Sequence, residues 1–127
     1  MNAKVAVGVI IAAMLAADTA HAQSGDVERG EHTFNQQCKI CHTIEKDGAN
    51  KVGPNLFGMF GRKAGTAKGF PASDAMVNSG IVWDEKTLAE YLKDPKGRVP
   101  KGKMVFVGLK NQDQLDDVIA YFRKATQ

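Results

Sequence analysis

The 127-residue chain has the length of a single domain. Its formal net charge is only +3 and it contains no lysine- or arginine-rich tract, so the composition argues against a general nucleic-acid binder. A domain of this size buries only about two-thirds of its unfolded surface, and a large apolar cofactor would enlarge that modest core.

Residues 1–22 have the features of an export signal. Lys4 supplies a positive charge, an unbroken apolar run extends from Val5 to Ala17, and Ala20-His21-Ala22 fits the pattern that precedes a signal peptidase cut. The apolar run is too short to span a bilayer, which needs roughly 20 residues. An uncleaved anchor or a core helix is the alternative. We predict a cleaved signal peptide over 1–22 and a mature domain over 23–127.

A first helix is predicted to follow the export signal and to end near the two cysteines. Ser24 is a candidate N-cap, and acidic residues such as Asp26 in the first turn suit the helix dipole. Gly30 and Phe34 are four residues apart and share a face of this helix. A glycine inside a helix costs about 1 kcal/mol against alanine, so we expect another element to approach closely at Gly30.

Residues 43–72 are rich in glycine, lysine and proline, which indicates loops and turns rather than strands. Such a long loop is unusual in a compact domain, unless it wraps around a cofactor. A short helix near 73–78 is possible. No alternating strand pattern is visible along the chain, so we predict an all-α fold with long loops.

Two further helices are predicted in the second half of the chain. Asp84 can cap a helix over 85–93, with Trp83 and Leu88 at the positions of a hydrophobic staple, and Pro95 stops it. A last helix over 112–125 begins at a sequence that resembles a capping box and carries an apolar stripe at helical spacing.

The sequence Cys38-Lys39-Ile40-Cys41-His42 carries the chemistry. C-x-x-C-H is the attachment signature of haem c, in which two thiols add to the vinyl groups and the histidine binds the iron. A dithiol oxidoreductase would place C-x-x-C in a βαβ pattern, which is absent. A structural zinc site needs four protein ligands, and only His32 and His42 remain after the signal is removed.

A second axial ligand is expected on the iron of an electron carrier, and His/Met ligation raises the reduction potential. Three methionines lie outside the predicted signal peptide. Met104 lies in a predicted loop that could cross the face of the haem opposite His42. Met76 is the runner-up, whereas Met59 follows the attachment site closely in a glycine-rich loop.

From Gly25 to its end, the chain resembles class I cytochromes c, both mitochondrial cytochrome c and its bacterial cytochrome c2-like relatives. The segments that carry this resemblance occur in the family's order and are Gly25-Asp26-Val27-Glu28-Arg29-Gly30, the haem motif, Gly53-Pro54-Asn55-Leu56, Gly61-Arg62-Lys63, Gly80-Ile81-Val82-Trp83, Tyr91-Leu92, Pro95, Lys103-Met104-Val105-Phe106 and Ala120-Tyr121-Phe122. The resemblance implies three main helices, short helices and long loops wrapped around one haem.

The resemblance also implies roles for single residues. His42 and Met104 would be the axial iron ligands, and the Pro54 carbonyl would accept a hydrogen bond from the other nitrogen of His42. Arg62 and Trp83 would reach a haem propionate. The remaining expectations are that Tyr91 lies near the Met104 sulfur and that Gly30 and Phe34 cross the last helix near Val118 and Tyr121.

The sequence departs from the family's pattern around the haem. Ala72 replaces a propionate-binding tyrosine of many relatives, Met76 replaces the usual asparagine, and Lys101-Gly102 replaces the usual glycine-threonine. These changes remove hydrogen-bond donors. We therefore predict that the Met104 loop is more mobile than in a typical relative.

The expected function is that of a soluble periplasmic monohaem cytochrome, not an enzyme, that shuttles single electrons between respiratory or photosynthetic membrane complexes. A quinol–cytochrome c reductase would be the donor, and a terminal oxidase or a photosynthetic reaction centre the acceptor. Lysines around one haem edge would attract acidic partners; they are Lys39, Lys51, Lys96, Lys103 and Lys110. We expect a monomer with no nucleic-acid partner. A haem peroxidase and a gas-binding protein are the alternatives, and both need an open iron site.

Overall fold

The computed structural model describes residues 25–127 and confirms the all-α prediction. Its helices are α1 (Val27–Gln37), α2 (Asp74–Val77), α3 (Glu85–Lys93), α4 (Pro95–Arg98) and α5 (Gln112–Ala125). Within this part of the chain the only β-type pairing is an isolated bridge between Lys63 and Val82. No helix in this part is long and apolar enough to cross a membrane. The predicted signal peptide lies outside the described residues.

The helix ends follow from local capping chemistry. The predicted cap Ser24 lies outside the described residues, and α1 is capped instead by Asp26, whose side chain accepts from the Arg29 backbone N–H. The prediction of Ser24 as the N-cap was wrong, because the carboxylate of Asp26, two residues further on, caps the helix. Asp84 caps α3 as predicted, and the hydroxyl of Thr87 completes a reciprocal capping box that the sequence reading did not anticipate.

The short helix α4 was not predicted. Asp94 ends α3 and also caps α4, because its side chain accepts from the Gly97 backbone N–H. Pro95 therefore opens a new helix, at the first position, where proline's missing N–H costs nothing. The Asp-Pro pair was the available signal for this second start.

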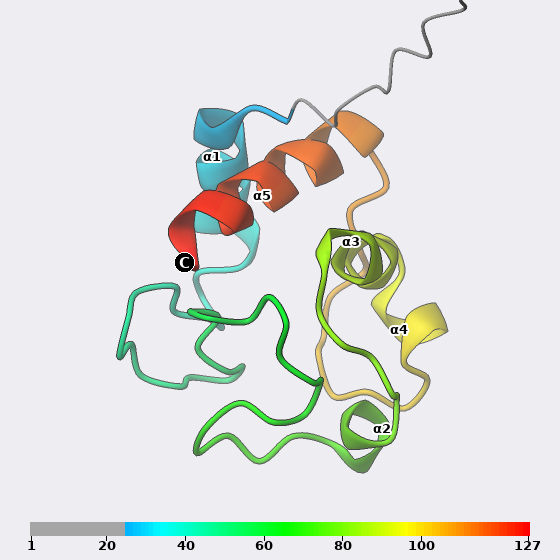
Figure 1. The fold of residues 1–127 in the computed structure, drawn as a ribbon. Helices are drawn as coiled ribbons and strands as arrows, with labels where there is room; N and C mark the ends of the chain where they lie inside the picture. The colour runs from blue at the N-terminus through cyan, green and yellow to red at the C-terminus, as the bar shows by residue number, and fades with distance from the viewer. Residues whose placement is uncertain (1–24) are drawn as a thin grey trace, which may run out of the picture.

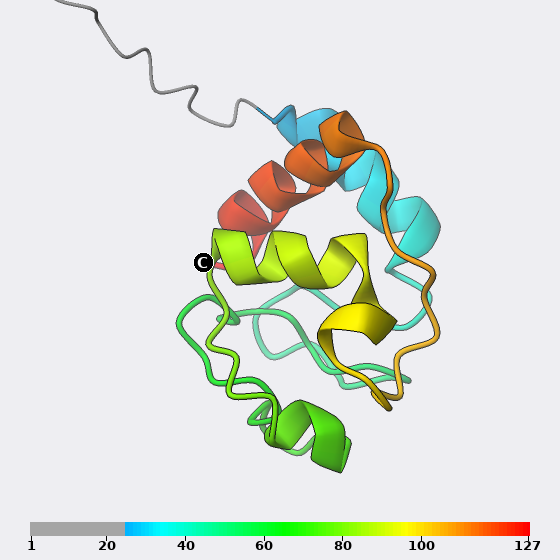
Figure 2. The ribbon, with the colours of Figure 1, turned by 90° about the vertical axis from the view of Figure 1, so that its right-hand side faces the viewer.

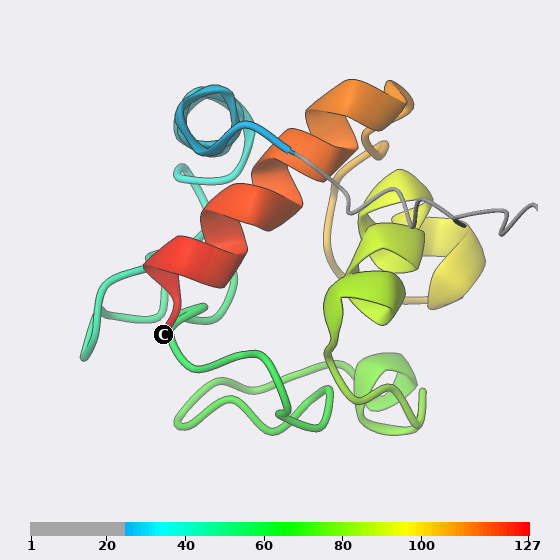
Figure 3. The ribbon, with the colours of Figure 1, turned by 45° about the horizontal axis from the view of Figure 1, so that its top comes forward.

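Helices α1 and α5 cross one another at the top of the molecule (Figure 1, Figure 3). A Cβ atom on Gly30 would collide with the carbonyl of Asp117 and would lie 2.8 Å from Cβ of Tyr121. The ring of Phe34 lies 5.6 Å from that of Tyr121. The prediction that another element approaches at Gly30 is confirmed, and the glycine is what allows the two backbones to meet.

The remaining elements surround a core that divides into two clusters. The larger cluster joins α1, α3 and α5 through residues such as Phe34, Leu92 and Val118. The smaller cluster consists of Ala64, Ile81, Tyr91 and Val99. The long loop before α2 extends below α1 and α5 in Figure 1, and Figure 2 shows α3 lying alongside α5. This arrangement gathers the loops that carry the candidate site.

Candidate haem-attachment site

The two cysteines lie where α1 ends. The backbone N–H of Cys38 still bonds to the Phe34 carbonyl, and the N–H groups of Cys41 and His42 both donate to the Cys38 carbonyl at 3.0 Å. Both thiols are free and half-buried. This tight turn holds the two thiols and the imidazole on one short stretch of chain.

Burial raises the pKa of the Cys38 thiol to about 11, and the neighbouring Cys41 adds to the effect. A dithiol oxidoreductase needs the opposite shift, because its attacking group is the thiolate. The environment of Cys38 therefore disfavours redox-thiol chemistry at this site.

The ring of His42 is fixed from two sides. Its Nδ1 lies 2.8 Å from the Pro54 carbonyl, which can only accept, so Nδ1 carries the proton and donates. Gly53 lies so close that a Cβ atom on it would collide with the imidazole. Burial lowers the pKa of His42 and favours the neutral ring. The lone pair is then on Nε2, the atom that can bind a metal.

The thioether of Met104 meets the phenol of Tyr91 at the smaller of the two core clusters. The Tyr91 hydroxyl donates to the sulfur of Met104 at 3.8 Å, and burial raises the pKa of Tyr91 to about 12. Met104 and Met76, the alternative ligand, both pack against the smaller core cluster. Met59 is almost fully buried in the larger cluster. Met59 is therefore a core residue, and two thioethers remain near the candidate site.

Arg62 and Trp83 are brought together by their backbones, because the Trp83 N–H donates to the Arg62 carbonyl at 3.0 Å. The Arg62 guanidinium donates to the carbonyl of Asn55 at 3.2 Å, and burial lowers its pKa. The Trp83 ring lies 5.3 Å from that of Tyr91. Among residues 25–127 no buried side-chain nitrogen lacks a partner, so the indole N–H of Trp83, which donates to none of these residues, is open to solvent. An accessible donor of this kind can reach an acidic group such as a haem propionate.

The residues present fit haem c. Two thiols and an imidazole with a free nitrogen lie on one turn, a thioether is held by a phenol, and an accessible indole N–H can donate to a propionate. The close approach of Gly53 to the ring could have been anticipated from the glycine that precedes Pro54. This contact was not predicted from the sequence.

The five predicted partner lysines are all exposed. The ammonium group of Lys51 donates to the backbone carbonyl of Lys39 at 2.5 Å, which places these two lysines beside one another. The ammonium group of Lys110 donates to the Lys93 carbonyl at 2.6 Å. Lys96 lies on α4, and Lys103 and Lys110 follow on the loop before α5.

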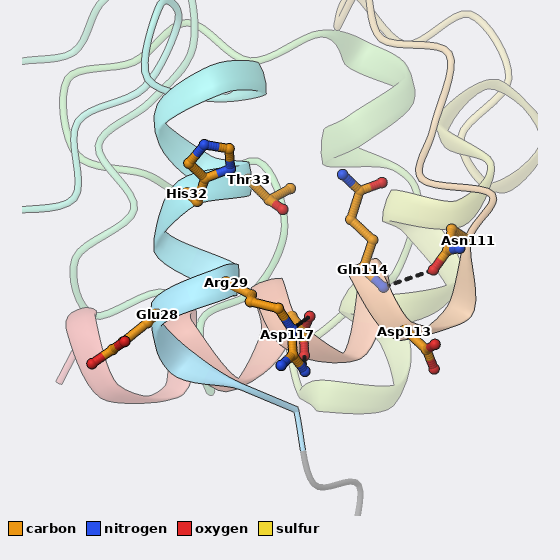
Figure 4. Close-up of a pocket in the computed structure, with 8 residues that line it drawn as sticks. All are labelled: Glu28, Arg29, His32, Thr33, Asn111, Asp113, Gln114 and Asp117. Carbon is orange, nitrogen blue, oxygen red and sulfur yellow. Dashed lines mark hydrogen bonds and ion pairs between the residues drawn. The ribbon is translucent and has the colours of Figure 1, made fainter.

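An open groove of about 680 Å³ lies elsewhere, along the crossing of α1 and α5 (Figure 4). Arg29 and Asp117 face one another in this groove, with Nε of Arg29 2.8 Å from Oδ2 of Asp117. Asn111 caps the N-terminus of α5, because its side-chain oxygen accepts from the Gln114 backbone N–H. None of the predicted site residues lines this groove. The ion pair between Arg29 and Asp117 links α1 to α5. The candidate site lies apart from this groove.

The sequence is similar to those of known proteins of one family. The family model described as cytochrome c matches residues 27–126. The chain is 47% identical to cytochrome c2 of Blastochloris viridis over 111 residues, which are 87% of this chain and 87% of that protein. It is 50% identical to cytochrome c of Chlamydomonas reinhardtii over 107 residues, which are 84% of this chain and 96% of that protein. It is also 46% identical to cytochrome c of Gibberella zeae over 103 residues, 81% of this chain and 97% of that protein.

Proposed function

This chain belongs to the cytochrome c family of monohaem electron carriers, and from that premise we propose how its own residues hold the haem. Cys38 and Cys41 would hold the haem covalently through thioether bonds, and His42 and Met104 would bind its iron. The observation that carries this proposal is that both ligand side chains are held by a neighbour, His42 by the Pro54 carbonyl and Met104 by the Tyr91 hydroxyl.

When bound, the haem supplies an iron that gains and loses one electron. The protein's contribution is to keep its own groups still while this happens. The Pro54 carbonyl fixes the imidazole, and the Tyr91 hydroxyl restrains the thioether. Buried Ile81 and Leu92 and half-buried Phe106 are apolar groups that exclude water from this region. A rigid, dry surrounding keeps the reorganisation that accompanies electron transfer small.

Arg62 and Trp83 are proposed to hold a propionate. The solvent-accessible indole N–H of Trp83 supports this role, and so does the backbone pairing that places Arg62 beside Trp83. Arg62 already donates to the Asn55 carbonyl, so its guanidinium has a fixed position before any further bond forms.

We further propose that the protein works in the periplasm after cleavage of residues 1–22. A quinol–cytochrome c reductase is the proposed donor, and a terminal oxidase or a photosynthetic reaction centre the acceptor. The five exposed lysines and the net charge of +3 favour acidic partners. Relatives named cytochrome c occur in an alga and a fungus, and the relative named cytochrome c2 occurs in a bacterium.

Optical spectra test this proposal. The protein is purified from a host that matures haem c, and its oxidised and reduced spectra are recorded with and without carbon monoxide. We expect a low-spin haem with a methionine–iron band and no response to carbon monoxide. The Met104→Ala variant should lose the band, while the matched variants Met76→Ala and Met59→Leu keep it. A high-spin wild-type spectrum that shifts with carbon monoxide would instead indicate an open iron site and favour a peroxidase or a gas-binding protein.

A further inference from the structure

The groove along the crossing of α1 and α5 contains a hydroxyl group without a partner. Thr33 lines this groove and is only 5% exposed. Its hydroxyl group makes no hydrogen bond with residues 25–127, and no fully buried side-chain oxygen in this part of the chain lacks a partner. The hydroxyl group is therefore accessible from the groove that Thr33 lines. Because polar groups on nearly buried residues are normally hydrogen-bonded, this one is open to a ligand.

Gln114 presents a second unused polar group to the same groove. Its backbone N–H is used in the capping of α5, but its side-chain amide makes no hydrogen bond within the described part of the chain. Figure 4 shows this side chain extending along the groove in the direction of Thr33. The two helices that form the groove therefore each offer an oxygen that can accept a hydrogen bond.

The groove also carries an excess of negative charge. With histidine counted as neutral, one guanidinium, that of Arg29, is set against the carboxylates of Glu28, Asp113 and Asp117. Arg29 binds Asp117 directly through two hydrogen bonds, at 2.8 and 3.0 Å. Figure 4 shows Glu28 and Asp113 on either side of this pair. Two further carboxylates beside neutral acceptors favour a cationic ligand.

We propose that this groove binds lysine side chains of a basic segment on a partner protein. An ammonium group has three donors and no acceptor, which matches carboxylate, hydroxyl and amide oxygens. Arginine fits less well, because its planar fork prefers a carboxylate that accepts two parallel bonds, and Arg29 already occupies Asp117 in this way. The inference goes beyond the proposed function and does not rest on it, since no proposed haem-binding residue lines the groove.

A protein segment is favoured over a free amine because the groove is open. Exposed ion pairs contribute little each, so a small amine held by them alone would bind weakly. A segment that belongs to a folded partner adds contacts along the neighbouring surfaces of α1 and α5. None of the five lysines proposed for the redox partner lines the groove, so the protein can hold a basic protein here while those lysines remain free.

Titration of the reduced, haem-loaded protein with a blocked tetralysine peptide tests the proposal. Backbone amide chemical shifts locate the binding site and give Kd at low ionic strength. Thr33→Val removes the hydroxyl group with little change of shape, and Thr33→Ser is its matched control because it keeps the hydroxyl group. The double variant Glu28→Gln/Asp113→Asn removes two charges from the groove. Its control, Asp47→Asn/Asp74→Asn, removes two charges from exposed residues that do not line the groove.

The peptide should shift the amide signals of the residues that line the groove. Thr33→Val should raise Kd about threefold, the loss expected for one hydrogen bond, whereas Thr33→Ser should leave Kd unchanged. The double variant at Glu28 and Asp113 should raise Kd about tenfold, and the control at Asp47 and Asp74 should raise it less than about twofold.

Shifts spread over all the exposed carboxylates would overturn the site. Equal losses in the two double variants would also overturn it, and so would an unchanged Kd in Thr33→Val. Binding of spermidine as tight as that of the peptide would overturn the protein partner and assign the groove to a free amine. Binding of a blocked tetraglutamate peptide in the groove would overturn the cationic ligand itself.

Discussion

The hydroxyl group of Tyr91 lies 3.8 Å from the sulfur of Met104 and donates a hydrogen bond to it. Tyr91 is fixed on α3, whereas Met104 lies in the loop between α4 and α5. The contact therefore ties the proposed iron ligand to a rigid element through a side chain 13 residues away. It also draws electron density from the sulfur, which makes the thioether a weaker donor.

Replacing Tyr91 by phenylalanine should lower the midpoint potential. Without the hydrogen bond the sulfur donates more strongly, which stabilises the oxidised iron. A hydrogen bond with a net contribution of about 1 kcal/mol limits the fall to roughly 40 mV for one electron. A spectroelectrochemical titration measures this shift. The control is Tyr121→Phe, which changes the chain's other tyrosine, and equal shifts in both variants would contradict the prediction.

Replacing Lys101 by glycine should steady the Met104 loop. The Gly102 N–H donates to the Val99 carbonyl at 3.0 Å and closes a turn, and Lys101 occupies its third position with φ of 66°. Only glycine adopts this region without cost, so we expect the free energy of unfolding to rise by about 0.5–1 kcal/mol. Hydrogen exchange over 100–108 should slow.

Asp47 provides the control for the Lys101 substitution, because it is the other non-glycine residue with positive φ in the described part of the chain. Asp47→Gly should leave the exchange of the Met104 loop unchanged. If exchange in this loop is already as slow in the wild type as in α1 and α5, the predicted mobility of the loop is wrong.

Replacing Gly30 by alanine should destabilise the protein although alanine favours helices. The added Cβ would collide with the Asp117 carbonyl, and backbone atoms cannot rotate away. Overpacking of this kind costs about 1–3 kcal/mol, more than the gain of about 1 kcal/mol in helix propensity. Chemical denaturation measures the difference. Glu31→Ala on the exposed face of α1 is the control and should change stability by less than about 0.5 kcal/mol.

Replacing Asp117 by asparagine should weaken the crossing of α1 and α5. The buried carboxylate accepts from the Asp26 backbone N–H at 2.6 Å and from the Arg29 guanidinium at 2.8 Å. We expect a loss of about 1–3 kcal/mol at neutral pH, since hydrogen bonds to charged groups are the stronger ones.

The loss at Asp117 should depend on pH in a defined direction. The hydrogen bond from Arg29 lowers the pKa of Asp117 in the folded protein. The carboxylate therefore stabilises the fold fully above its ordinary pKa of about 3.9, and this contribution fades as pH falls through the lowered folded value. Urea titrations of both proteins should converge in acid. A difference that stays constant down to the lowest pH would rule out this electrostatic account.

Local patterns predicted much of the fold. The bounds expected for α3 and α5 match the structure, because caps such as Asp84 and apolar side chains at helical spacing act within one turn of the chain. The residues Cys38, Cys41 and His42 were assigned for the same reason, since the attachment signature is contiguous. Helix α4, which begins at Pro95, was not predicted, because Asp94 is both the C-cap of α3 and the N-cap of α4.

The sequence by itself determined the chemistry of attachment, since two thiols and an imidazole within five residues leave little else to decide. Only the tertiary structure decided what surrounds them. It paired the carboxylate of Asp117 with the guanidinium of Arg29, 88 residues away, and it brought Val52 beside the segment that carries Ile40. An acidic residue in an amphipathic helix and an aliphatic residue in a loop give no local sign of such partners. Their positions follow from how the helices cross and the loops pair, and these are long-range contacts that no short window of sequence contains.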